Sequence, residues 1–250
     1  MLNIEVLNMI GERVMRRSAL MQFKRFEVNG EYRDIQIELD AILDGDVDAI
    51  KIKSRGSTEF TGNIMAKEAR FAGLCKIGGN CNIEFLEVCG ESKIDGNIIA
   101  DELIVDGKLK CNGKLLECNK VKLSGTITSG GELKASVATG KGGLVLEKIE
   151  SDNIDLIFNK KTTLKEIKGT KINIIGTKSK GFISKCLSKG GLLVEINNIE
   201  GNDITLENIE AKSVKGHNIK IGKNCIIEKV EYTGEININA NSKVTKKIKL

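Results

Sequence analysis

The 250-residue sequence contains no proline and no tryptophan, and aromatic residues make up only 4% of it. The absence of proline excludes collagen-like sequence and proline-rich linkers. No apolar run approaches the roughly 18 residues that a membrane-spanning helix requires, which excludes a transmembrane helix. Hydrophobic residues still account for 40% of the chain and charged residues for 29%. This composition predicts a soluble protein with one or two folded domains.

Histidine and paired cysteines are also scarce. The chain has one histidine, His217, and its seven cysteines include no CxxC pair. An odd, scattered set of cysteines is typical of reduced thiols in a cytoplasm. The N-terminal apolar residues precede the arginines, the reverse of the order in a signal peptide, so we expect a cytoplasmic protein. A net charge of +5 permits an anionic partner, although no nucleic-acid partner is expected.

Glycine, in contrast, is abundant and periodic. One series recurs every 17 residues, at Gly45, Gly62, Gly79, Gly96, Gly113 and Gly130. A second series has the same spacing, at Gly56, Gly73, Gly90 and Gly107. A fixed period of this kind is the signature of a repeat architecture. We predict that the six glycines of the first series are structural corners at which the chain turns.

Apolar residues within each repeat occur in pairs two positions apart. Counted from the first glycine, the pairs fall at positions 3 and 5, 8 and 10, and 14 and 16. Such alternation predicts strands with one buried face. Three short strands in about 17 residues predict one coil of a parallel β-helix, an all-β solenoid. The missing proline fits this fold, because nearly every backbone N–H donates to the next coil.

The repeat frame changes along the chain. It slips by one residue between Gly113 and Gly131 and is looser from 131 to 175. The stretch from Gly176 to Gly191 interrupts it, after which the alternation restarts. We predict an N-terminal cap or membrane-contact segment over 1–25, a parallel β-helix over 26–175, a basic loop over 176–191 and a short C-terminal β-solenoid module over 192–250.

The motifs of enzymes on related folds are missing. The left-handed hexapeptide helix of acyltransferases needs an aliphatic residue at every sixth position, where this chain is mostly charged, and it needs histidines. The segment 138–144 lacks the spacing of a phosphate-binding loop. We therefore predict no catalytic residue, no metal site and no cofactor, and an exposed His217. Five cysteines fall on apolar columns and are expected to be core thiols: Cys75, Cys81, Cys111, Cys118 and Cys225.

Several segments resemble the bactofilins, bacterial polymer-forming cytoskeletal proteins with a right-handed parallel β-helix. The similarity rests on IDGNI at 94–98, VDG at 105–107, LKEIKG at 164–169 and above all the block at 199–234, which looks like the C-terminal module of longer, two-part members. It covers roughly residues 28–250. The resemblance implies a right-handed coil and a nucleotide-independent scaffold that assembles end to end and positions other proteins, often at the membrane.

Two functions stay open at this stage. The first is a non-enzymatic scaffold that binds further copies of itself through its terminal coils, together with client proteins that the sequence does not identify. The alternative is a β-helix enzyme or binding protein acting on a carbohydrate or another anionic ligand. The ends of a β-helix expose unpaired backbone groups, which either pair with another molecule or carry caps that keep the protein monomeric. Lys76, Lys93 and Lys110 are expected to form a like-charge stripe that discourages lateral packing.

An anionic membrane surface is a further expected partner, at the inner face of the cell membrane. Between residues 160 and 189 there are nine lysines and one acidic residue, Glu166. Apolar side chains in such a loop can enter the headgroup boundary while lysines face anionic lipid. The candidate contacts are Phe182, Ile183, Leu187, Lys178, Lys180 and Lys185, with the apolar N-terminus as a second weak anchor. A solvated loop and an N-terminal cap over the first coil are the alternative.

Overall fold

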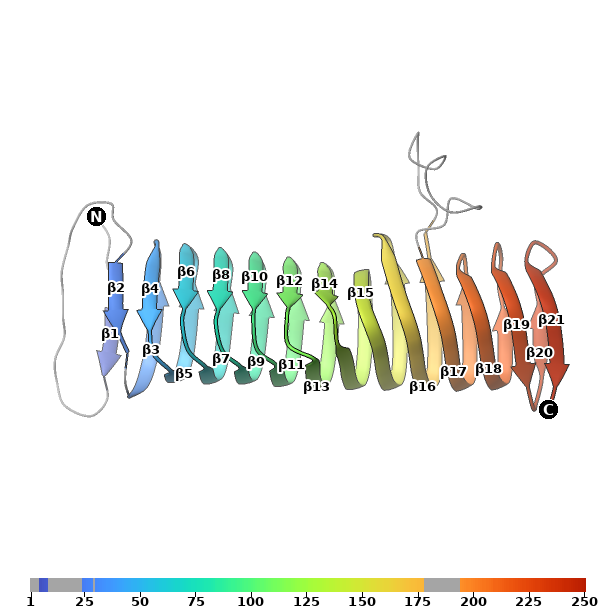
Figure 1. Ribbon diagram of the computed structural model, residues 1–250, viewed down its shortest axis with the longest axis horizontal. Helices are drawn as coiled ribbons and strands as arrows, with labels where there is room; N and C mark the ends of the chain where they lie inside the picture. Colours follow the sequence, from blue (N-terminus) through green and yellow to red (C-terminus); the bar gives the residue numbers. More distant parts are fainter. Residues whose placement is uncertain (1–4, 9–23, 29, 178–193) are drawn as a thin grey trace, which may run out of the picture. The chain divides into compact units, whose positions relative to one another are not determined.

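The computed structural model describes residues 5–8, 24–28, 30–177 and 194–250 (Figure 1). These ranges contain no helix. Their parallel strands stack as a β-solenoid of about 12 turns, in which paired strands are ~17 residues apart in the sequence. The predicted all-β parallel solenoid is confirmed, and its right-handedness stays a prediction. Each turn is called a coil below.

The strands are short in the first half of the chain and long in the second. Their bounds are β1 (Glu5–Asn8), β2 (Lys24–Glu27), β3 (Glu31–Ile37), β4 (Ala41–Asp44), β5 (Val47–Ser54), β6 (Ser57–Phe60), β7 (Ile64–Phe71), β8 (Leu74–Ile77), β9 (Cys81–Val88), β10 (Glu91–Ile94), β11 (Ile98–Val105), β12 (Lys108–Cys111), β13 (Leu115–Leu123), β14 (Thr126–Ser129), β15 (Glu132–Phe158), β16 (Thr162–Gly176), β17 (Val194–Glu207), β18 (Glu210–Ile221), β19 (Ile226–Tyr232), β20 (Ile236–Ile238) and β21 (Lys243–Lys249).

The chain forms two compact units. Unit 1 comprises Met1–Lys120 with Ile127–Gly130, and unit 2 comprises Val121–Thr126 with Gly131–Leu250. The units therefore divide where the 17-residue frame slips by one residue. The interruption at 176–191, which we expected to separate two modules, lies inside unit 2.

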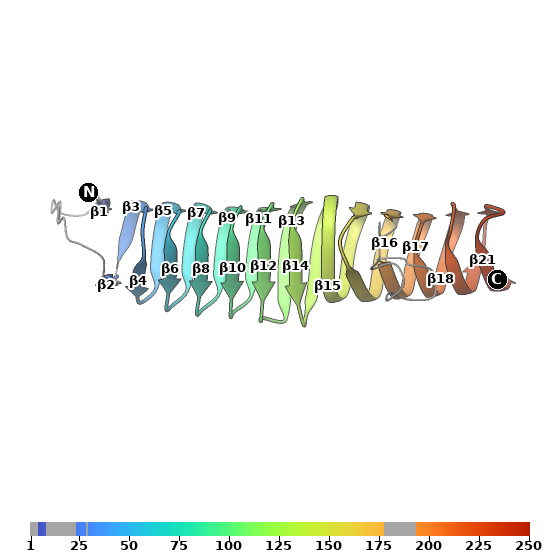
Figure 2. The same cartoon turned by 90° about the horizontal axis from the view of Figure 1, so that it is seen from above.

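Each coil of unit 1 consists of one longer and one shorter strand. In Figure 2, β3, β5, β7, β9 and β11 follow one another in one row, and β4, β6, β8, β10 and β12 form another. β7 pairs with β9 in parallel register, with Ile64 opposite Cys81. Within β7 the residues Ala66 and Ala69 are both buried, and the two residues between them face outward. Two of the three predicted strands thus merge into one strand that bends between its two inward-facing pairs.

The core of unit 1 is a set of stacked columns. Position 8 of the repeat is completely buried in Ile52, Ala69, Leu86 and Leu103. Two of the few aromatic residues, Phe60 and Phe71, lie close together, with ring centroids 6.0 Å apart. Strands stacked at the usual spacing of about 4.8 Å leave little room for bulkier rings, so branched aliphatic side chains dominate the column.

Unit 2, taken by itself, also consists of stacked parallel strands, with a variable repeat length. Ile167 on β16 pairs with Ile199 on β17 across the interruption. Ile199 then pairs with Val214, and Val214 pairs with Val230. The repeat is therefore 15 and then 16 residues after the interruption, and it returns to 17 where Val230 pairs with Lys247. Because β16 and β17 are direct neighbours in register, residues 194–250 extend the solenoid of unit 2.

Candidate functional site

The last coil of unit 2 is an open end. β20 pairs with β18 and β21 pairs with β19, and neither has a second partner among the described strands (Figure 1). Ile236 stacks on the buried Ile219, and Val244 stacks on the buried Ile227. Both Ile236 and Val244 are only half-buried, because no further coil covers them. This end therefore offers free backbone groups together with apolar side chains.

In the first coil of unit 1, one of the two strands has its outer edge covered by a further strand. β1 pairs antiparallel with β3, so that Val6 lies opposite Ile35. β2 pairs with β4 and has no second partner among the described strands. The backbone of β1 is thus arranged as a partial cap, and residues 9–23 of the expected cap or membrane-contact segment lie outside the described residues.

Charges on the sides of the coils pair between neighbouring coils. Lys76 Nζ lies 2.6 Å from Glu59 Oε1, and Lys51 Nζ lies 2.7 Å from Glu68 Oε2. The hydrogen bond from Lys51 lowers the pKa of the Glu68 carboxyl from its ordinary value. These partners are 17 residues apart, so each pair links one coil to the next.

The expected lysine stripe forms in register. Lys93 lies opposite both Lys76 and Lys110 on the neighbouring strands. Two of the three charges are compensated, since Lys76 pairs with Glu59 and Lys93 Nζ lies 3.0 Å from Asp95 Oδ1. The stripe is therefore less repulsive than three free lysines would be.

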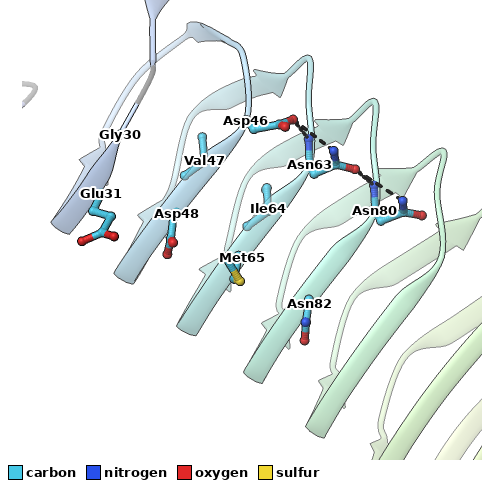
Figure 3. A pocket seen from close by; sticks show the side chains of 10 residues that line it. All are labelled: Gly30, Glu31, Asp46, Val47, Asp48, Asn63, Ile64, Met65, Asn80 and Asn82. Atoms are coloured by element: carbon cyan, nitrogen blue, oxygen red, sulfur yellow. Dashed lines mark hydrogen bonds between the residues drawn. The ribbon is translucent and has the colours of Figure 1, made fainter.

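A shallow groove of about 520 Å³ crosses the corners that lead into β3, β5, β7 and β9 (Figure 3). Its upper rim is an amide ladder: the side-chain oxygen of Asp46 accepts a hydrogen bond from the backbone N–H of Asn63 at 2.7 Å. Asn63 in turn accepts one from Asn80 at 2.8 Å, and Asn80 accepts one from Asn97 at 2.8 Å. Sequence reasoning missed this ladder, although the four residues share position 2 of the glycine frame.

The groove carries three carboxylates at its N-terminal end. Glu31 lies directly opposite Asp48 on the neighbouring strand, and Asp46 also lines the groove. Exposed Met65 and Asn82 complete its floor (Figure 3). The lining contains no histidine, lysine or arginine. Amide and carboxylate groups can hydrogen-bond to a neutral sugar, whereas the carboxylates would repel an anionic ligand.

Glu87, Cys89 and Asp106 form a second cluster, with ligand atoms all within 4.8 Å of one another. One thiolate and two carboxylates could hold a zinc ion. The guanidinium of Arg70 lies 3.2 Å from Glu87 and competes for that carboxylate. No metal site was predicted from the sequence, and this cluster was not among the candidates. The signal was present, because Asp106 follows Cys89 by one 17-residue repeat.

The cysteines on the apolar columns are buried, as predicted. Burial raises the pKa of the Cys118 thiol to about 12, and it raises the pKa of Cys75 well above the ordinary value. Thiols with such pKa values are unreactive at neutral pH. Cys89 is exposed, and Cys186 lies outside the described residues.

His217 is exposed, and its Nδ1 lies 2.8 Å from the Thr233 hydroxyl. The glycine-rich segment 138–144 lies within β15 and forms no loop in front of a helix. The candidate membrane contacts lie outside the described residues: Phe182, Ile183, Leu187, Lys178, Lys180 and Lys185.

The predicted corner glycines differ in how strictly glycine is needed. Gly45 has a positive φ of 123°, which favours glycine. A side chain at Gly62, Gly79, Gly96 or Gly113 would overlap the backbone of the preceding coil. A Cβ at Gly130 would meet nothing within 4 Å, so close packing does not explain glycine there.

Comparison with known proteins assigns this chain to no family. No family model matches it, and no solved structure matches it. The uncharacterized protein YhbF of Bacillus subtilis (strain 168) is 34% identical over 87 residues, which is 35% of this chain and 34% of that protein. The chain thus spans about a third of the relative that it matches. Within the described ranges, the structure holds no helix that could span a bilayer.

Proposed function

We propose that this protein is a non-enzymatic, nucleotide-independent scaffold that polymerises end to end, as the resemblance to the bactofilins implies. The observation that carries this proposal is the open last coil, where β20 and β21 keep one unpaired edge among the described strands. Adding a strand to an exposed sheet edge is a common mode of protein association. A second copy can supply both the missing backbone partners and an apolar cover.

The apolar side chains of that coil support the same role. Ile238 stacks on Ile221, which is 1% exposed, whereas Ile238 itself is half-buried. Leu250 at the chain end is 61% exposed. A joint with another copy would bury these side chains, and burial of apolar surface is worth about 25 cal/mol per Å².

The sides of the coils suit a scaffold that presents binding surfaces to other proteins. Their charges are largely compensated between neighbouring coils, as in the Lys51–Glu68 pair, which limits side-to-side association of copies. We propose client proteins and an anionic membrane surface as further partners, with the basic segment 176–191 as the membrane contact, and a cytoplasmic location at the inner face of the cell membrane. No cofactor and no nucleic acid is part of this proposal.

Electron microscopy of negatively stained protein tests the scaffold function. Purified protein is examined over a range of concentrations, with and without ATP or GTP. The proposal predicts rods whose length grows with protein concentration and does not depend on nucleotide. Single particles of constant size at all concentrations would contradict it.

The groove supports a second candidate, a carbohydrate-binding module. Its carboxylates and amides are suited to a neutral oligosaccharide, with Asp48 and Asn82 on its floor. Titration of the protein with chito- and cello-oligosaccharides, followed by NMR, tests this function. Shifts confined to the groove and lost in Asp48→Asn with Asn82→Ala would support the module, and unchanged spectra at millimolar sugar would exclude it.

A further inference from the structure

One buried column of unit 2 ends on a charged residue. From β15 to β21, each strand places one residue of this column directly opposite the next. The first five members are at most 1% exposed and the sixth is a lysine: Ile149, Ile167, Ile199, Val214, Val230 and Lys247. Opposed residues of paired parallel strands point to the same side of the sheet. Lys247 therefore occupies a core position of the last coil.

The other stacked core positions of the last coil are apolar, at Ile236, Ile238 and Val244. Lys247 is exposed and has no ion-pair partner among the described residues. β21 itself contains no acidic residue. The open end is therefore an apolar surface with a free cation in it.

An ammonium group at this position opposes the addition of a further coil. A strand placed on β21 in the register of the solenoid would cover Lys247 as β21 covers Val230. The ammonium would then lose its water without gaining an anion, or its long side chain would have to reach solvent through the joint. Inward-pointing charges are a known protection of sheet edges against unwanted pairing.

The first coil of unit 1 protects its edge in a different way. β1 pairs antiparallel with β3 and so covers the outer edge of that strand. No strand among the described residues covers the outer edge of β21. The last coil thus lacks a covering strand, and it is the coil in which a charge interrupts a buried column.

We propose that Lys247 weakens strand addition at the open last coil, so that joints between copies at this end form reversibly. This inference rests on the proposed scaffold function, whose joint Lys247 regulates. A solenoid end with an aliphatic residue in this column would stack on another apolar edge without restraint. Lys247 sets the strength of the joint through the one position where the partner would have to bury a charge.

Three substitutions in β21 test the proposal. Lys247→Leu removes the charge from the column, and Lys247→Arg keeps it. Lys246→Leu is the matched control, because it makes the same exchange at the adjacent residue, which lies opposite Lys229 instead of a buried residue. Thermal melting verifies that all three variants fold. Sedimentation velocity over a range of protein concentrations, at low and at high salt, measures their assembly.

We expect Lys247→Leu to assemble at about tenfold lower protein concentration than wild type, because its joint buries an apolar side chain in place of an ammonium. Lys246→Leu and Lys247→Arg should assemble within about twofold of wild type, since an exposed charge contributes little and the arginine retains the buried one. The gain in Lys247→Leu should persist at high salt, because salt screens exposed charges and does not remove the penalty for burying one.

Lys247→Leu that assembles like wild type would overturn the proposal. A gain shared by Lys246→Leu or by Lys247→Arg, or one that disappears at high salt, would also overturn it. Rods from Lys247→Leu alone, with wild type monomeric, would support the role of Lys247 and count against the scaffold function. If neither wild type nor Lys247→Leu assembles at any concentration, the scaffold function and this inference are both refuted.

Discussion

The carbonyl oxygen of Gly90 occupies the space in which a side chain at Gly107 would begin. Gly73 and Gly90 have the same relationship one coil earlier. The second glycine series is therefore a column of close backbone contacts that continues from coil to coil. Its spacing in the sequence reflects a packing requirement as well as a turn.

Gly107→Ala is expected to destabilise the protein by about 2–3 kcal/mol, because the new methyl group must displace backbone of the preceding coil. Gly130→Ala is the matched control, since a Cβ there meets nothing within 4 Å. Thermal and urea unfolding of both variants measure the difference. Equal stability of the two variants would show that the Gly90–Gly107 contact is not constrained.

Ala100→Phe is expected to cost about 1–3 kcal/mol or more, because the buried column has no space for a ring. Ala100 is 7% exposed, whereas its neighbour Ile99 is 48% exposed. Ile99→Phe is therefore the control, and its unfolding free energy should change little. Ala66 occupies the equivalent buried position in an earlier coil, so Ala66→Phe should behave like Ala100→Phe. A melting temperature like that of wild type in both alanine variants would contradict their inward orientation.

Cys89 is expected to be the fast-reacting thiol among the six described cysteines, in a Cys186→Ser background. Partial burial and then the charge of Glu87 raise the pKa of this thiol, so its thiolate fraction at pH 8 is small. Because the thiolate is the reactive form, labelling with Ellman's reagent should accelerate as the pH rises. Glu87→Gln removes the neighbouring charge, lowers the pKa and should speed labelling at pH 8. An unchanged rate in Glu87→Gln would rule out the electrostatic coupling.

Membrane contact is expected to depend on the basic segment. Wild type should pellet with anionic vesicles at low salt and remain in the supernatant with neutral vesicles. Phe182→Asp with Lys180→Glu should abolish pelleting, whereas the charge-matched pair Ile99→Asp with Lys110→Glu should not. Equal recovery in the supernatant with both lipids would exclude membrane binding. Equal loss of pelleting in both double variants would attribute membrane binding to net charge alone.

The stacked core was predictable because a solenoid repeats one set of packing positions. Residues such as Ile52 and Leu86 recur in one column at the 17-residue spacing, and both are completely buried. The merging of two strands within β7 was harder to predict from the sequence, since the bend lies between Ala66 and Ala69 and no glycine marks it.

Sequence reasoning did not identify features that depend on contacts between coils. The amide ladder from Asp46 to Asn97 forms because each corner side chain accepts a hydrogen bond from a backbone N–H of the next coil. The sequence alone does not show this contact. The antiparallel pairing of β1 with β3 has no counterpart in the repeat, so no column of the sequence indicated it.

The most direct measurement of end-to-end assembly compares two single substitutions by sedimentation velocity over a range of protein concentrations. Ile248→Glu places a charge in the open last coil, where Ile248 is half-buried, and Met65→Glu places one on the side of unit 1, where Met65 is 52% exposed. The scaffold account predicts that Ile248→Glu remains monomeric at concentrations at which wild type and Met65→Glu form rods. Rods from Ile248→Glu, with loss of assembly in Met65→Glu, would contradict it.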